Sequence, residues 1–147
     1  MSEHRIQLEW KKETADFNYE TYNRGHSVKF EGGQSIKASA APAFKGDASM
    51  ANPEEMLAAA LSSCHMLTFL AMAAKASFVV NKYTDHAVAI LDKNSEGKMA
   101  VTEVKLNPKI EFVGAAPDAA KLSELHEKAH KYCMIGNSVL TKVSVQH

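Results

Sequence analysis

The sequence predicts an α+β fold in which two helices pack on antiparallel sheets. Segments that alternate apolar and polar residues flank a long uncharged segment within 52–77, and a second helical segment begins only after residue 114. Because strands and helices do not alternate one by one, the order does not fit a repeated βαβ unit with a parallel sheet. With 147 residues, the chain is expected to form one domain, residues 1–147.

The N-terminal part is expected to form a small set of strands. Residues 6–10 and 17–21 each alternate apolar with polar side chains, which is typical of strands with one buried face. Residues 28–30 indicate a third strand. The sequence Glu-Gly-Gly-Gln at 31–34 predicts a hairpin turn that leads into a short strand around Ile36.

A loop at 40–51, rich in turn-forming residues, leads to a long helix at about 52–77. Asn52 is a good N-cap, and Pro53 fits the first helical position, where its missing N–H would have no partner. Glu55, three residues after the cap, completes a capping-box pattern. We therefore expect this helix to begin sharply at Asn52.

No charged residue occurs from Met56 to Ala74, and a helix that is apolar nearly all round is normally buried on all sides. The run is long enough to suggest a membrane span. Much of it is alanine, however, and four polar side chains would need partners in lipid: Ser62, Ser63, His65 and Thr68. We therefore expect a core helix, with Cys64 as its one reactive side chain.

The second half continues the α+β pattern. The expected elements are a strand at 78–91, a turn at 93–97, a strand at 99–112, a helix at about 114–132 and a final strand at 139–145. Pro108 cannot donate to a strand ladder, so an edge or a bulge is expected there. One apolar stripe of the second helix is formed by Leu122, Leu125, Ala129 and Cys133.

The composition of the chain limits which binding partners and which cellular location are expected. The chain has 17 basic and 17 acidic residues, a formal net charge of zero, and no block of like charge. Binding to nucleic acid or to an acidic membrane surface therefore gains little support. The N-terminal residues lack the apolar core of a signal peptide, and two cysteines are too few for a secreted disulfide scaffold. A cytoplasmic location is expected.

Cys64 and Cys133 are the first candidates for chemistry. A thiolate is the reactive form of cysteine, and a dry environment disfavours it unless a cation lies nearby. Cys64 lies far from its helix N-terminus, so the helix dipole offers little help. From periodicity alone, two buried cysteines are more often inert packing residues than reactive ones.

Two motifs resemble the signatures of the OsmC/Ohr family of thiol peroxidases. The first is Asn-Pro-Glu-Glu at 52–55 with Leu-Ala-Ala-Ala at 57–60 and Ser-Cys at 63–64. The second is Ala-His-Lys-Tyr-Cys at 129–133, followed by Asn137. The motifs occur in family order at roughly family spacing, and the expected order of elements fits along almost the whole chain.

The resemblance implies an OsmC-like fold, with antiparallel sheets around a long buried central helix, in an intertwined homodimer. Cys64 would be the peroxidatic cysteine and Cys133 the resolving one. Arg24 would match the active-site arginine, and Glu54 the acid that orients it. The implied activity is cofactor-free reduction of organic hydroperoxides, with regeneration by a dithiol such as a lipoyl group or a thioredoxin-like donor, as protection against oxidative stress.

Two other interpretations remain. The sequence His-Glu-Lys-Ala-His at 126–130 satisfies the zinc-peptidase pattern, but no Asp or Glu follows His130 to supply a third ligand. A surface helix with two exposed histidines is expected instead, and no metal site is predicted. The alternative function is a non-catalytic OsmC-like stress protein or redox sensor whose cysteines are structurally buried.

Overall fold

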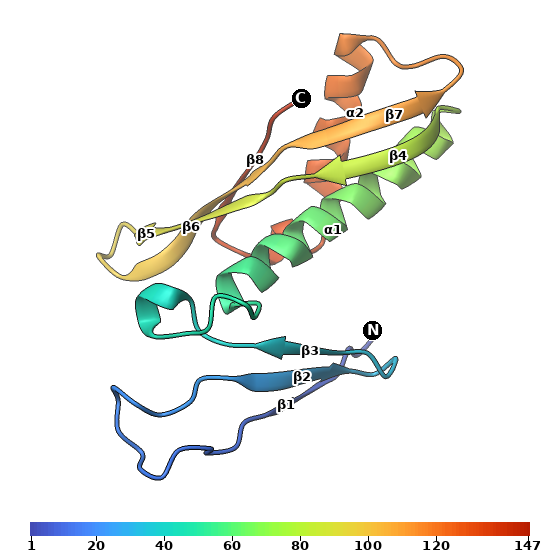
Figure 1. Ribbon diagram of the computed structural model, residues 1–147. Coiled ribbons are helices and arrows are strands. Elements are labelled where there is room, and N and C mark those ends of the chain that lie inside the picture. The colour runs from blue at the N-terminus through green and yellow to red at the C-terminus, as the bar shows by residue number, and fades with distance from the viewer. The chain divides into compact units, whose positions relative to one another are not determined.

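The computed structural model describes residues 1–147, which form two compact units, 1–56 and 57–147. Figure 1 shows the elements in chain order. They are β1 (Ile6–Glu9), β2 (His26–Phe30), β3 (Ser35–Ala38), the short 3-10 helix η1 (Pro42–Phe44), α1 (Pro53–Lys75), β4 (Val79–Asp85), β5 (Val88–Lys93), β6 (Met99–Leu106), β7 (Pro108–Val113), α2 (Ala119–Tyr132), the 3-10 helix η2 (Gly136–Ser138) and β8 (Lys142–Val145). The predicted α+β class is confirmed.

The first unit is built on a three-stranded antiparallel sheet in the order β1-β2-β3. Val28 on the central strand faces Leu8 on one neighbour and Ile36 on the other. The sequence predicts that one face of this first strand is buried. That prediction is wrong for this unit, because all four residues of β1 are exposed. As an edge strand, β1 has a neighbour on one side only, and its apolar side chains remain uncovered in the chain.

Residues 17–21 form a loop, so the predicted strand there is wrong. The side chain of Asn18 accepts a hydrogen bond from the Glu20 N–H at 3.0 Å, and its carbonyl accepts from Thr21 and Tyr22. The Thr21 hydroxyl donates to Asp16 at 3.0 Å. Asp and Asn side chains that bond nearby backbone compete with strand pairing, which overrides the alternating pattern.

The start of α1 follows the sequence closely. Asn52 Oδ1 accepts a hydrogen bond from the Glu55 N–H at 2.9 Å, and Glu55 Oε2 accepts one from the Asn52 N–H at 3.0 Å. This reciprocal pair is the predicted capping box, and a cap of this kind contributes about 1 kcal/mol to helix stability. The position of every later side chain on α1 depends on this start.

The second unit contains two long antiparallel arms. β4 pairs with β7, and β5 pairs with β6, so the inner hairpin is nested within the outer pair. Figure 1 shows β4 leading into β5 and β6 leading into β7. The two long strands expected from the sequence are therefore each divided, one at His86–Ala87 and the other at Asn107, just before Pro108.

The last strand adds one parallel pairing to this otherwise antiparallel arrangement. β8 pairs with β6 in parallel, with Glu103 facing Lys142 and Leu106 facing Val145. The connection from β6 to β8 passes through β7 and α2, which is long enough to bring the chain back in the same direction.

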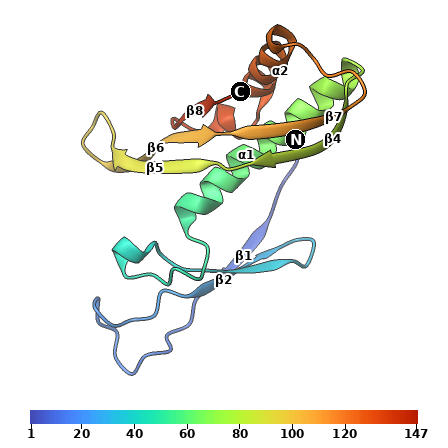
Figure 2. The ribbon, with the colours of Figure 1, turned by 45° about the horizontal axis from the view of Figure 1, so that its top comes forward.

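Both helices of the second unit pack on the strands (Figure 2). One apolar cluster joins Leu61 of α1 to Val104 and Leu106 of β6. The other joins Phe69 of α1 to Leu125 of α2, with β4 and β7 packed against them. Within the chain, α1 is buried along one stripe rather than on all sides; the stripe consists of Ala58, Leu61, His65, Phe69 and Ala73.

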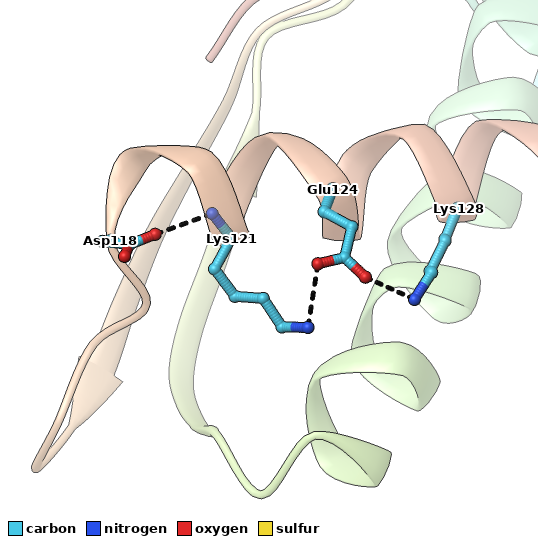
Figure 3. A network of polar contacts seen from close by, with 4 residues as sticks. All are labelled: Asp118, Lys121, Glu124 and Lys128. Carbon is cyan, nitrogen blue, oxygen red and sulfur yellow. Dashed lines mark hydrogen bonds and ion pairs between the residues drawn. The ribbon is translucent and has the colours of Figure 1, made fainter.

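α2 begins at a side-chain cap and carries an ion-pair ladder on its outer face (Figure 3). Asp118 Oδ1 accepts a hydrogen bond from the Lys121 N–H at 2.8 Å. Glu124 pairs with Lys121 at 2.9 Å and with Lys128 at 2.5 Å. Surface pairs at these spacings each contribute a few tenths of a kcal/mol. The opposite, apolar face of α2 packs inward, and Cys133 caps the C-terminal end of the helix.

Candidate active site

The structure brings the two cysteines together in the second unit. Cys64 lies in the middle of α1 and is half-buried, whereas Cys133 is the C-cap of α2 and is 3% exposed. Both are free thiols, and each sulfur accepts a hydrogen bond from one of two consecutive backbone N–H groups, those of Ile135 and Gly136, so the two side chains are neighbours. Two residues separated by 69 positions in the sequence thus form one dithiol site.

Backbone N–H groups from the start of η2 also face this pair. The Ile135 N–H donates to Cys64 Sγ at 3.5 Å, and the Gly136 N–H donates to Cys133 Sγ at 3.2 Å. Sequence reasoning missed these donors, because a side-chain pattern does not indicate where a backbone N–H points. The two donors therefore hold both sulfur atoms at the start of η2.

Cys133 is held as a thiol. Burial is the main cause that raises the pKa of Cys133 to about 11, and the hydrogen bond to Cys64 raises it further. The Gly136 N–H acts in the opposite direction but does not compensate. At neutral pH, Cys133 therefore keeps its proton.

Arg24 and Glu54 belong to the first unit, and the dithiol belongs to the second. The Arg24 guanidinium lies over the Tyr22 ring at 4.0 Å, and it donates to the Tyr22 carbonyl at 2.7 Å and the Tyr19 carbonyl at 2.6 Å. Glu54 lies in the first turn of α1, where one carboxylate oxygen, Oε2, is buried without a hydrogen-bond partner. Arg24 and Glu54 do not form an ion pair with each other.

A buried histidine pair is the main feature that sequence reasoning missed. His65 Nε2 and His126 Nδ1 are 3.1 Å apart, and the planes of the two rings are nearly parallel, at an interplanar angle of 6°. Each ring keeps a second buried nitrogen without a partner, Nδ1 of His65 and Nε2 of His126. The expectation of two exposed histidines on the second helix is therefore wrong for His126, although His130 is exposed.

The family model described as OsmC-like protein matches residues 46–147. The chain belongs to the OsmC-like family. A search of curated proteins finds no match.

Among solved structures, an OsmC-like protein of unknown function from Vibrio cholerae is 44% identical, with a TM-score of 0.95 over 99% of each chain. An OsmC-like protein from Mycoplasma pneumoniae is 16% identical, with a TM-score of 0.75 over 99% of this chain and 95% of that one. An organic hydroperoxide resistance protein from Elizabethkingia anophelis is 20% identical, with a TM-score of 0.73 over 99% of this chain and 93% of that one. The last two likenesses are at the level of the fold.

Three of the four polar residues named above for α1 find partners inside the second unit of this OsmC-like protein, and the fourth, Ser63, is exposed. The Ser62 hydroxyl donates to Asp85 at 2.5 Å, His65 bonds His126, and the Thr68 hydroxyl donates to the Cys64 carbonyl at 2.8 Å. By length and composition α1 could cross a membrane, but the core helix of a soluble protein meets the same criteria. The internal partners favour the core helix.

Alkylation of the reduced protein at pH 8 is expected to modify Cys64 well before Cys133. Cys133 is nearly inaccessible and its raised pKa keeps it protonated, and the thiol form reacts poorly with iodoacetamide. Peptide mass spectrometry after a short exposure measures the two sites separately. Equal labelling of both cysteines in the folded protein would contradict this arrangement of the pair.

Proposed function

We propose that this OsmC-like protein is a thiol peroxidase that reduces organic hydroperoxides through Cys64 and Cys133. The observation that carries the proposal is that a half-buried thiol and a buried one bind the N–H groups of two consecutive residues, Ile135 and Gly136, and so lie beside each other. A disulfide can form only between cysteines that are already close. The Ile135 N–H adds support, because its hydrogen bond to Cys64 Sγ holds this sulfur beside the residues that follow Cys133.

The proposed reaction has three steps. The Cys64 thiolate attacks the distal oxygen of ROOH, the O–O bond breaks, and after protonation the products are ROH and a Cys64 sulfenic acid. The Cys133 thiol then attacks the Cys64 sulfur, which releases water and forms a Cys64–Cys133 disulfide. An external dithiol reduces this disulfide through a mixed disulfide and is itself oxidised to a disulfide.

Arg24 is proposed to stabilise the negative charge on the leaving alkoxide. Glu54 is proposed to orient the Arg24 guanidinium. Two N–H groups of Arg24 bind carbonyl oxygens of its own loop, and the remaining donors are available to an oxygen ligand. Glu54 has a buried acceptor without a partner, which suits a guanidinium. The intertwined homodimer implied by the resemblance would supply these groups to the dithiol.

The first experiment is stopped-flow oxidation of the reduced protein by tert-butyl hydroperoxide, with hydrogen peroxide in parallel and thiol counting at the end. We expect fast loss of both thiols together, and a clear preference for the organic peroxide. Retention of two free thiols after one equivalent of peroxide would refute the proposal. In cells, the proposed setting is a reducing cytoplasm that supplies a lipoyl or thioredoxin-like dithiol.

Arg24→Ala is expected to slow oxidation of Cys64 by roughly a hundredfold, because loss of one charge-stabilising donor typically costs that much in rate. Arg5→Ala is the matched control, since Arg5 is the only other arginine and its side chain is highly exposed. Stopped-flow kinetics of both variants decides the matter. An Arg24→Ala rate equal to that of Arg5→Ala would remove Arg24 from the proposed site.

The second candidate is a non-catalytic OsmC-like stress protein. It is favoured by one observation: the 44% identical structure from Vibrio cholerae is described as of unknown function, whereas three similar structures described as organic hydroperoxide resistance proteins are 16% to 20% identical. Under this alternative the buried dithiol would oxidise slowly and without preference among peroxides. The same stopped-flow experiment therefore separates the two functions.

A further inference from the structure

The reduced dithiol of Cys64 and Cys133 has the features of a binding site as well as those of a redox pair. Both cysteines are free, and their sulfur atoms accept hydrogen bonds from two consecutive backbone N–H groups, those of Ile135 at 3.5 Å and Gly136 at 3.2 Å. The two sulfurs are therefore neighbours before any bond joins them. Cysteine sulfur is a soft ligand, so the pair favours a soft metal or metalloid over a hard cation such as Mg²⁺.

The turn that follows Cys133 holds this pair in place. The Cys133 carbonyl accepts from the Asn137 N–H at 3.0 Å, and the Ile135 carbonyl accepts from the Ser138 N–H at 3.0 Å. The Asn137 side chain also donates to the Lys131 carbonyl, near the end of α2, at 3.2 Å. Because these bonds fix the backbone that carries both sulfur-binding N–H groups, a ligand that bridges the sulfurs meets a site that is already ordered.

The number of side chains at the pair limits what it can bind. No group of three or more His, Cys, Asp and Glu side chains in the chain is arranged to hold a metal ion. Zinc sites in proteins use three or four side chains, so two thiols alone satisfy zinc poorly. Trivalent arsenic that carries one carbon substituent needs only two further bonds, and two sulfur atoms supply them.

The dry surroundings of Cys133 favour a ligand that binds neutral thiols. Cys133 is 3% exposed, and burial raises its pKa to about 11. A metal ion binds thiolates and must displace both thiol protons, which is costly where the thiolate is disfavoured. An arsenical of the form RAs(OH)₂ reacts with two neutral thiols instead. Both As–O bonds break, two As–S bonds form, and the thiol protons leave in two molecules of water. Arsenic stays trivalent, so no oxidant or reductant is needed.

We infer that the dithiol of Cys64 and Cys133 binds trivalent arsenicals, with one arsenic atom bonded to both sulfurs. Cys64 is half-buried and is the thiol that an arsenical reaches first, and Cys133 then closes the bridge. The inference goes beyond the proposed peroxidase and does not rest on it, because it requires two neighbouring thiols and no reaction with peroxide. The bridged form has no free thiol, so arsenical binding and peroxide reduction exclude each other.

Phenylarsine oxide, which is hydrated to C₆H₅As(OH)₂ in water, is the probe for this site. We would titrate the reduced chain with it under nitrogen, after removal of the reductant, and then count free thiols and measure the mass of the intact protein. One phenylarsine group per chain and the loss of both thiols together are expected. Loss of only one thiol for each bound group, or retention of both thiols, would overturn the inference.

Two variants test whether the neighbouring positions of the thiols matter. Cys133→Ser is expected to bind phenylarsine oxide at least about a hundredfold more weakly, because the second bond can no longer form within the chain. Cys133→Ser/Ser95→Cys is the matched control, since it restores two thiols but places the second at an exposed position between β5 and β6. It should bind as weakly as Cys133→Ser. Wild-type affinity in either variant would contradict a bridge between neighbouring sulfurs.

Zinc tests the argument from ligand number and charge. Equimolar phenylarsine oxide should protect Cys64 of the wild type from iodoacetamide, whereas equimolar Zn²⁺ should leave it open to alkylation. Peptide mass spectrometry measures the label at this position. Equal protection by Zn²⁺ would show that the pair does not select trivalent arsenic.

The inference and the proposed function can fail separately. One bound phenylarsine group per chain, without peroxide-dependent loss of thiols, would overturn the peroxidase and leave the arsenical site. Fast loss of both thiols with tert-butyl hydroperoxide, together with a wild-type affinity for phenylarsine oxide no greater than that of Cys133→Ser, would overturn the arsenical site and leave the peroxidase.

Discussion

Cys64→Ser is expected to abolish peroxide reduction, with a loss of at least roughly a thousandfold in rate, because a serine hydroxyl at this position has no base to activate it. Ser63→Ala is the matched control, since Ser63 is the exposed neighbour on the same helix. The measurement is consumption of tert-butyl hydroperoxide in the presence of a dithiol. Activity that persists in Cys64→Ser would place the chemistry on another group.

Cys133→Ser is expected to separate the two halves of the cycle. One equivalent of peroxide should still oxidise Cys64, but no internal disulfide can form, so the sulfenic acid persists and is open to further oxidation. Mass spectrometry after exposure to peroxide should show oxygen added to Cys64. The number of added oxygen atoms should increase with excess peroxide. A variant that recycles as fast as the wild type would show that Cys133 does not resolve the intermediate.

Acid is expected to destabilise the protein through the buried histidine pair. Burial is the largest cause that lowers the pKa of His65 from 6.5 to about 4, and the nearby His130 and His147 act in the same direction while Asp85 opposes them. Burial likewise lowers the pKa of His126 to about 4, followed by the effects of His65 and His147.

The direction follows from proton binding. Between pH 6.5 and 4 the unfolded chain binds protons at these two positions and the folded chain does not, so the free energy of unfolding falls as the pH falls through this window. A shift of this size corresponds to on the order of 3 kcal/mol for a single histidine. Above pH 6.5 both states are neutral at these sites, and the contribution to the pH dependence disappears.

Urea unfolding from pH 8 to pH 4.5 tests this expectation. The double variant His65→Leu/His126→Leu should show a flatter dependence on pH than the wild type, whatever its absolute stability. His86→Gln is the control, because His86 is exposed in the same unit. An unchanged pH dependence in the double variant would contradict the assigned role of the pair.

The sequence was most informative where local chemistry decides the structure. The capping box at Asn52, the turn around Asn94 and the apolar stripe of α2 depend on neighbouring residues, and the structure confirms each. Residues 17–21 show the limit. Their alternation has the period of a strand, but Asp16 and Asn18 bond the nearby chain and turn it into a loop.

The candidate site was harder to predict than the local structure, because it is formed by residues far apart in the sequence. Periodicity alone favoured inert cysteines, and only the family resemblance paired Cys64 with Cys133. The contact of His65 with His126 could not be predicted, because it joins two helices 61 positions apart in the sequence. A polar residue inside an apolar helix was the available signal, since a buried imidazole needs a partner. It indicated that a partner exists, but not which residue provides it.

The nesting of the β5–β6 hairpin inside the β4–β7 pair has a kinetic consequence. Lys93 pairs with Met99, six residues further along the chain, whereas Val79 pairs with Val113 across the whole inner hairpin. Pairing of the inner strands brings the ends of the outer strands close together. The entropy of loop closure then favours a zipper that starts at the turn and runs outward, with β8 added last. Gly97 adopts φ +76° in that turn, so Gly97→Ala should slow refolding much more than it speeds unfolding in a chevron measurement. The tip of this hairpin would then be the folding nucleus of the unit that carries both thiols.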